Sequence, residues 1–318
     1  MKKRWIAILF CLPGLCARQA DTSPKLNERI GAKIQHFDGV VSLYAKNLDT
    51  GKSYELRGND PVRTASTIKL AIMVECFAEA GEGKLSLSEP IKITESEKVS
   101  GSGILQELSA GDQLPIRDIV DLMIVLSDNT ATNLLLNRIG GNAVNTHMAQ
   151  LGLVQTRVMR KILGDGNQLK STPSGITIEG AKPENKKWGI GRTTPREMVT
   201  ILEKLYRGEL VSKTASEEML TILKRQRDRN GIGRNMKDVE IASKSGTLDH
   251  LRSDVGLVYS KQGNIAMAIT IDNIPEINWS SDNPALLLIS SLSEILVDEL
   301  GSNGNPIARV PGQSYRSN

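Results

Sequence analysis

The sequence is poor in cysteine and histidine, and each shortage excludes a class of site. Its 318 residues include only Cys11, Cys16, Cys76, His36, His147 and His250. Two of the cysteines fall within the first twenty residues, so the rest of the chain has no disulfide framework. The histidines are far apart in sequence and show neither metal-ligand spacing nor a position near Cys76. We therefore expect no metal, no cofactor, and a buried, inert Cys76 thiol.

Blocks of like charge are also missing. Lys and Arg number 40 and Asp and Glu 36, and the two signs are interspersed, which leaves a net charge of only +4. Nucleic acid is therefore not an expected partner. The hydrophobic content of 39% and charged content of 24% are usual for a soluble globular protein, and the length suits one large domain or two small ones.

The first twenty residues are typical of an export signal. Lys2, Lys3 and Arg4 precede an apolar run at 5–15, and small residues follow near Ala20. The run is short for a membrane span. We expect a signal peptide at 1–20 and a periplasmic or secreted protein. A lipid anchor at Cys16 is the less favoured alternative, because the preceding leucine suits a lipidation motif poorly.

Apolar periodicity predicts strands near both ends of the chain and helices between them. The expected strands are 40–48, 53–57, 239–245, 254–260 and 265–272. The expected helices are 25–36, 67–80, 116–139 with a break near 127–129, 194–207, 216–226 and 284–300. Hairpin signals between consecutive strands indicate an antiparallel sheet. The chain is therefore expected to be an α/β protein, with one sheet built from both ends and a helical subdomain inserted.

Three short motifs carry the chemistry. Residues 66–69 read Ser-Thr-Ile-Lys at the start of an apolar helix, 127–129 read Ser-Asp-Asn, and 244–247 read Lys-Ser-Gly-Thr at the end of a strand. Each motif alone is a weak signal, because a serine before a helix can be an N-cap and a lysine is usually solvated. In this order and on these elements, they indicate a serine acyl-transfer enzyme.

The first motif supplies a nucleophile and a base. Ser66 and Lys69 are three residues apart on an expected helix, and so they lie on the same face. A serine hydroxyl needs an adjacent base to take its proton. Lys69 precedes the apolar run 70–74, and burial together with the positive end of the helix lowers a lysine pKa. A neutral amine beside Ser66 follows from this environment.

A second Ser-Asp-Asn occurs at 281–283 and is interpreted as structural. Pro284 and an apolar helix follow it directly. An Asp282 or Asn283 N-cap with proline in the first helical position explains this copy completely.

The chain resembles the class A β-lactamases within the penicillin-recognising serine hydrolases, a β-lactamase/transpeptidase-like group. The resemblance rests on the three motifs, on SDNTATNLLLNRIGG at 127–141 and on Thr-Thr-Pro at 193–195, and it extends roughly over residues 28–300. It implies an antiparallel sheet flanked by helices plus an all-α subdomain, with the active site between them. We place the catalytic domain at 21–318, with its α/β part at 25–63 and 210–300 and its all-α part at 64–209.

The resemblance also implies the catalytic roles. Ser66 would be the nucleophile and Lys69 its base, and Ser127 would relay a proton to the leaving nitrogen. Backbone amides of Ser66 and Thr247 would form an oxyanion hole.

Four further residues would bind substrate. Asn129 would hold the substrate amide, and Lys244 with Ser245 and Thr247 would hold its carboxylate. A weaker expectation is that Arg252 adds positive charge nearby.

The family's deacylating glutamate is missing. It normally lies a few residues after a Thr-Arg pair such as 156–157, where this chain has Ile162. The acidic residue before Thr-Thr-Pro is absent too, which deprives Arg160 of its usual loop-closing partner. The loop at 164–191 is long, and Glu179 and Glu184 within it are the candidate substitute bases.

Three functions stay open at this point. The first is a β-lactamase that confers antibiotic resistance by β-lactam catabolism, with slow turnover where the usual base is lacking. The second is a peptidoglycan DD-peptidase or esterase with the same acylation apparatus. The third is a penicillin-binding receptor that is acylated and not hydrolysed. The expected partner is a small β-lactam or a peptidoglycan-like substrate, and the expected state is a monomer.

Overall fold

The computed structural model describes residues 24–164 and 175–301, so the expected leader lies outside the described residues. Five antiparallel strands form the main sheet, in the order β2-β1-β10-β9-β8. They are β1 (Val40–Asn47), β2 (Ser53–Leu56), β8 (Glu240–Leu248), β9 (Leu251–Ser260) and β10 (Gly263–Asp272). The N-terminal strands join the C-terminal strands where β1 pairs with β10. The predicted sheet is confirmed.

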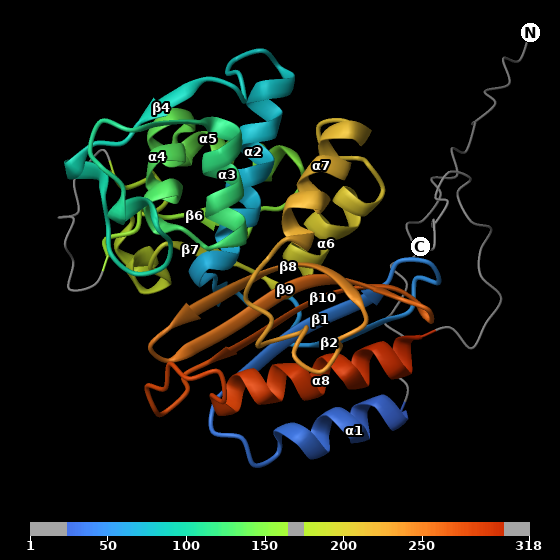
Figure 1. Ribbon diagram of the computed structural model, residues 1–318. Coiled ribbons are helices and arrows are strands. Elements are labelled where there is room, and N and C mark those ends of the chain that lie inside the picture. The colour runs from blue at the N-terminus through green and yellow to red at the C-terminus, as the bar shows by residue number, and fades with distance from the viewer. Residues whose placement is uncertain (1–23, 165–174, 302–318) are drawn as a thin grey trace, which may run out of the picture.

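Helices cover both faces of this sheet (Figure 1). On one face lie α1 (Pro24–Ile34) and α8 (Pro284–Leu300). On the other face, α6 (Pro195–Tyr206) packs on β1 and β10, and α7 (Lys213–Lys224) packs on β8. Beyond them stands a helical group of α2 (Lys69–Gly81), α3 (Ile116–Val125), α4 (Asn129–Ile139) and α5 (Gly141–Gln150).

Short strands and 3-10 turns occupy the connections between the longer elements. One small sheet has the order β3-β7-β6, with β3 (Val62–Arg63), β6 (Arg157–Val158) and β7 (Gly191–Thr193), and β4 (Pro90–Lys92) pairs with β5 (Gln113–Pro115). The 3-10 turns are η1 (Ala65–Ile68), η2 (Glu95–Glu97), η3 (Leu105–Glu107) and η6 (Pro183–Trp188).

Two apolar cores hold these layers together. One lies between the sheet and α8, where Ile269 and Leu292 are fully buried. The other fills the space around α2, where Met73 and Ile124 are also fully buried. Each such side chain contributes roughly 1.5–3 kcal/mol of transfer free energy. Because α2 runs through the second core, its first turn is fixed in place by packing.

The helices follow the sequence predictions with two differences. The helix expected at 67–80 is divided into the 3-10 turn η1 and α2, and α5 was not predicted. The break near 127–129 and the helix at 284–300 are confirmed. Asn283 caps α8 by accepting a 2.8 Å hydrogen bond from the Ala285 amide, so the second Ser-Asp-Asn is structural. Within the described residues, no helix combines the length and apolarity that crossing a membrane requires.

Candidate active site

Ser66 stands at a sharp turn where the chain passes from β3 into α2. It is half-buried and lies within η1. The preceding Ala65 has a φ of 46°, a left-handed value that residues with a Cβ atom adopt rarely. Backbone strain of this kind collects at functional sites, where the surrounding structure maintains it.

Gly246 of β8 brings the third motif against this turn. A Cβ atom at position 246 would lie 2.8 Å from the Thr64 carbonyl oxygen and 3.1 Å from the Ser66 nitrogen. Only glycine allows β8 to approach the turn so closely. The edge strand of the sheet therefore passes directly beside Ser66.

Lys69 joins the first motif to the second. It is fully buried, and Nζ donates to the Ser127 carbonyl oxygen at 2.6 Å, to Ser127 Oγ at 3.2 Å and to Asn129 Oδ1 at 3.1 Å. Burial holds the pKa of Lys69 well below its usual value, and the positive charge of Lys244 lowers it further, while Asp128 opposes the shift. An amine in this environment can accept a proton from a neighbouring hydroxyl.

Ser127 and Asn129 are held in place by the backbone around them. Ser127 has a φ of 55°, a second left-handed residue at this site. Asn129 Nδ2 donates to the Ser100 carbonyl oxygen at 3.1 Å, while its Oδ1 accepts from Lys69. Both side chains thus border the Lys69 ammonium.

Asp128 between them is structural. It is buried, and its Oδ1 caps α4 by accepting from the Ala131 amide at 2.8 Å. Its Oδ2 accepts from the amides of Ile104 and Leu105 at 2.7 and 2.9 Å. Asp128 therefore fastens the neighbouring loop to the site.

The third motif lies at the end of β8. Lys244 is fully buried, and its Nζ donates to the Ser245 carbonyl oxygen at 2.7 Å. Burial lowers the pKa of Lys244 to about 8, and Asp228 and Asp254 oppose the shift. Ser245 and Thr247 on the same strand are half-buried. Lys244 is near enough to Lys69 to lower its pKa, so the three motifs converge.

Arg252 lies on β9 opposite Thr247, with its guanidinium occupied by backbone groups. It donates to the carbonyl oxygens of Leu248 and Leu251 at 2.5 and 2.7 Å and to that of Asn278. The ring of Trp279 lies 5.3 Å away. Its contribution of charge to a substrate stays a prediction.

The backbone of Ile162 is fixed by Asn133 of α4, a residue that the sequence analysis missed. The Asn133 side chain accepts from the Ile162 amide and donates to its carbonyl oxygen, each at 2.9 Å. Asn133 lies one turn after Asn129 on α4, so both side chains project from the same face. The spacing of the two asparagines within the Ser-Asp-Asn segment is the signal that could have identified it.

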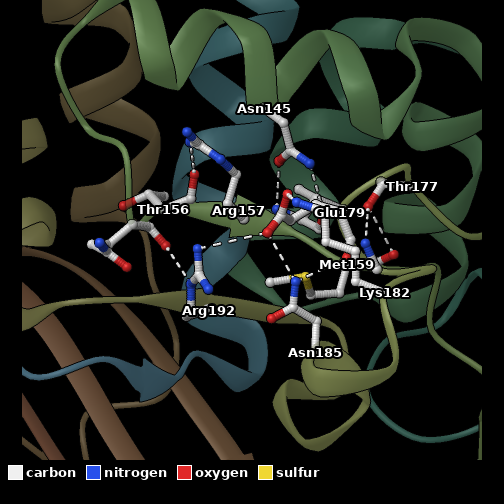
Figure 2. Close-up of polar contacts among 12 residues, drawn as sticks. Asn145, Thr156, Arg157, Met159, Thr177, Glu179, Lys182, Asn185 and Arg192 are labelled. Atoms are coloured by element: carbon white, nitrogen blue, oxygen red, sulfur yellow. Dashed lines mark hydrogen bonds and ion pairs between the residues drawn. The ribbon is translucent and has the colours of Figure 1, made fainter.

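The two candidate bases in the long loop lie in different environments. Figure 2 shows Glu179 bound to Lys182 and Asn185, at 2.8 Å each, and facing Arg192. The Lys182 hydrogen bond leads the contacts that lower the pKa of Glu179, which makes its carboxylate a weaker base. Glu184 is exposed in the first turn of η6.

Comparison with known proteins gives relatives that include two β-lactamases. The chain is 26% identical over 241 residues to β-lactamase BRO-1 of Moraxella catarrhalis, covering 74% of this chain and 68% of that protein. It is 24% identical over 216 residues to β-lactamase CARB-3 of Pseudomonas aeruginosa, covering 67% of this chain and 69% of that protein.

Solved structures agree with these relatives. A β-lactamase of Sphaerobacter thermophilus has a TM-score of 0.73 and 25% identity, covering 86% of this chain and 96% of that one. A PBP-A variant, solved as an acyl-enzyme complex with penicillin G, has a TM-score of 0.71 and 26% identity, and it also covers 86% of this chain and 96% of that one. A sequence model of the β-lactamase enzyme family matches residues 25–300. The chain therefore belongs to the β-lactamase enzyme family.

Proposed function

We propose that the protein is a serine hydrolase that opens β-lactams through an acyl-enzyme on Ser66. The observation that carries this proposal is the buried Lys69 amine in contact with Ser127 and Asn129, with Lys244 near enough to lower its pKa. The two β-lactamase relatives, and the PBP-A variant with penicillin G as an acyl-enzyme, support it.

Each step of acylation has a residue to perform it. Neutral Lys69 takes the hydroxyl proton of Ser66, and Oγ attacks the lactam carbonyl carbon. The backbone amides of Ser66 and Thr247 stabilise the resulting oxyanion. The carbon–nitrogen bond then breaks, and the proton passes from Lys69 through Ser127 to the leaving nitrogen.

Substrate orientation is assigned to the groups around this centre. Asn129 holds the substrate amide, and Lys244 with Ser245 and Thr247 holds its carboxylate. The positive charge of Lys244 is available for this role below its pKa of about 8.

Deacylation is proposed to be slow. Position 162, whose backbone Asn133 fixes one helical turn after Asn129, carries an isoleucine that cannot activate water. General-base assistance is worth about a hundred- to ten-thousand-fold, and its loss would make the acyl-enzyme persist. This feature favours an enzyme of low turnover. It also keeps open a DD-peptidase or esterase of the same family and a receptor that remains acylated.

We also propose an exported, monomeric protein. The charged, apolar and small-residue order at 1–20 supports export, and it would place the site where β-lactams and peptidoglycan are met.

One incubation separates these functions. The protein is mixed with a labelled penicillin and, in parallel, with a chromogenic cephalosporin. We expect an adduct that persists for minutes and weak cephalosporin hydrolysis. Absence of both an adduct and hydrolysis would overturn the serine acylation. Fast hydrolysis without an adduct would overturn slow deacylation, and Glu184→Gln and Glu179→Gln would then identify the base.

A further inference from the structure

Two acids lie close to the proposed carboxylate subsite of Lys244, Ser245 and Thr247. Lys244 is fully buried, and a buried ammonium needs opposite charge nearby. Burial lowers its pKa to about 8, and the negative charges of Asp228 and Asp254 oppose this, so both acids lie near the ammonium. The carboxylate subsite is therefore bordered by negative as well as positive charge.

Asp254 is the inner of the two acids. It lies on β9 directly opposite Ser245 of β8, the edge strand of the sheet (Figure 1), so the two side chains share one face. It is 2% exposed, and its Oδ2 accepts from the Ile232 amide at 2.9 Å. Its Oδ1 is buried without a hydrogen-bond partner among the described residues. Asp254 thus adds negative charge behind the subsite but is closed to a ligand.

Asp228 is the outer acid. The segment that carries it is anchored at both ends. Gln226 Nε2 donates to the Ile124 carbonyl oxygen in the last turn of α3 at 2.8 Å, and the Ile232 amide donates to Asp254 on β9. Asp228 lies between these anchors and is half-buried. Its carboxylate is therefore held between the helical group and the sheet, where a substrate can reach it.

The Asp228 carboxylate has one oxygen to offer. Its Oδ1 accepts from the amide and the side chain of Asn230, at 3.1 and 2.9 Å. Its Oδ2 makes no hydrogen bond within the part of the chain that the structure describes. Burial lowers the pKa of Arg252, and the charges of Asp249 and Asp228 oppose this. Asp228 therefore acts on both cations at this end of the site, Lys244 and Arg252.

A substrate meets both signs of charge here. A lone carboxylate is attracted by Lys244 and repelled by Asp228, whereas a carboxylate with a neighbouring cation satisfies both residues. In cephalosporins, the C3 substituent is attached next to the carbon that carries the carboxylate. A positive charge on that substituent therefore accompanies the carboxylate into the subsite.

We propose that Asp228 is a specificity residue that recognises a cationic group beside the substrate carboxylate, so that zwitterionic β-lactams are the favoured substrate class. This inference rests on the proposed function and names the substrate class within it. Lys244 holds the carboxylate, and Asp228 Oδ2 holds the cation.

The test uses two cephalosporins with the same thienylacetamido side chain. Cephaloridine carries a cationic pyridiniomethyl group at C3, and cephalothin carries a neutral acetoxymethyl group. The ratio of their second-order acylation constants is measured for each variant, because their different intrinsic reactivities cancel when ratios are compared. We expect Asp228→Asn, which keeps the shape and removes the charge, to lower the cephaloridine-to-cephalothin ratio about fivefold, the upper end of what exposed ion pairs contribute.

Two further variants serve as controls. Asp228→Glu keeps the charge and should retain the preference for cephaloridine. Asp238→Asn removes a charge at an exposed position and should keep the parental ratio. The inference is wrong if Asp228→Asn matches Asp238→Asn, or if Asp228→Glu loses the preference as fully as Asp228→Asn.

Binding without acylation separates this inference from the proposed function. Calorimetry with Ser66→Ala measures the affinity for each cephalosporin in the absence of a nucleophile. We expect tighter binding of cephaloridine, and loss of that difference when Asp228→Asn is added. If the parent protein is not acylated while this difference is present, the proposed function fails and the charge preference stands. Equal binding of the two cephalosporins to Ser66→Ala, or binding of neither, would overturn the inference.

Discussion

Asn133 holds Ile162 by both of its backbone hydrogen-bonding atoms. Because both hydrogen bonds involve backbone atoms, Asn133 positions residue 162 whatever side chain that residue carries. The backbone of residue 162 is therefore fixed to α4, while the side chain that it carries here is aliphatic.

Ile162→Glu should convert slow deacylation into fast deacylation. A carboxylate at a position whose backbone is already fixed can activate water, and we expect the adduct to decay about a hundred- to ten-thousand-fold faster. Intact-mass measurement of adduct decay checks this. Ile162→Gln is the control, because it has the same shape without basicity. Equal decay in the two variants would show that residue 162 does not face the ester.

Ser66→Ala should abolish covalent attachment of a labelled penicillin while the circular dichroism spectrum stays unchanged. Loss of a nucleophile that acts as a unit with its base lowers the rate on the order of a million-fold. Peptide mapping of the labelled parent protein provides the second check. A label found on Ser127 would reassign the nucleophile.

Acylation by carboxylate-bearing lactams should decline as pH rises through about 8. Burial lowers the pKa of Lys244 to about 8, so its positive charge is lost over that range, and with it the attraction for the carboxylate. Second-order acylation constants measured from pH 6 to 9.5 test this. Lys244→Ala should be slower at pH 7 and flat above it. An unchanged alkaline decline in that variant would assign the titration to another group.

Asp254 should make the protein less stable as pH rises from about 4 to 7. Its carboxylate is 2% exposed, its Oδ1 has no hydrogen-bond partner among the described residues, and burial raises its pKa from 3.8 to about 7. Between those values the folded state binds more protons than the unfolded state, so stability falls with rising pH, by about 4 kcal/mol at most.

Asp254→Asn removes this titration while keeping an acceptor for the Ile232 amide, which now donates to Oδ2 at 2.9 Å. Thermal unfolding midpoints between pH 4 and 8 should therefore decline less in this variant than in the parent protein. Asp60→Asn, at an exposed position, is the control and should keep the parental slope. Parallel slopes in all three proteins would refute the assignment.

The apolar periodicity of the sequence, together with the residues that typically begin and end helices, predicts most of the fold. α8 begins and ends where Pro284 and Gly301 indicate, because these signals are local. The start of α2 was misplaced because Ala65 adopts a left-handed conformation that packing against Gly246 maintains, and a local pattern contains no trace of that contact. α5 was missed because it begins at two glycines and buries only Val144 and Met148.

The site was predictable only as far as its motifs extend. The motifs predict Lys69 and Lys244 as site residues, and the structure places them near enough for Lys244 to lower the pKa of Lys69, while their catalytic roles stay predictions. The Asn133–Ile162 contact was not foreseen, because the motif that contains Asn133 does not say which backbone groups its side chain will bind. The Glu179–Arg192 contact was not foreseen, because the loop before β7 has no periodicity from which its path could be predicted.

The pairing of β1 with β10 has a consequence for the order of assembly during synthesis. Residues 40–47 leave the ribosome long before residues 263–272, and β1 has only the short β2 as a partner until then. Pairing between such distant segments carries a large loop-closure entropy and folds slowly. β8, which places Gly246 beside Ser66, is also made late. The segment that carries the nucleophile is therefore synthesised well before β8, the strand that completes the active site.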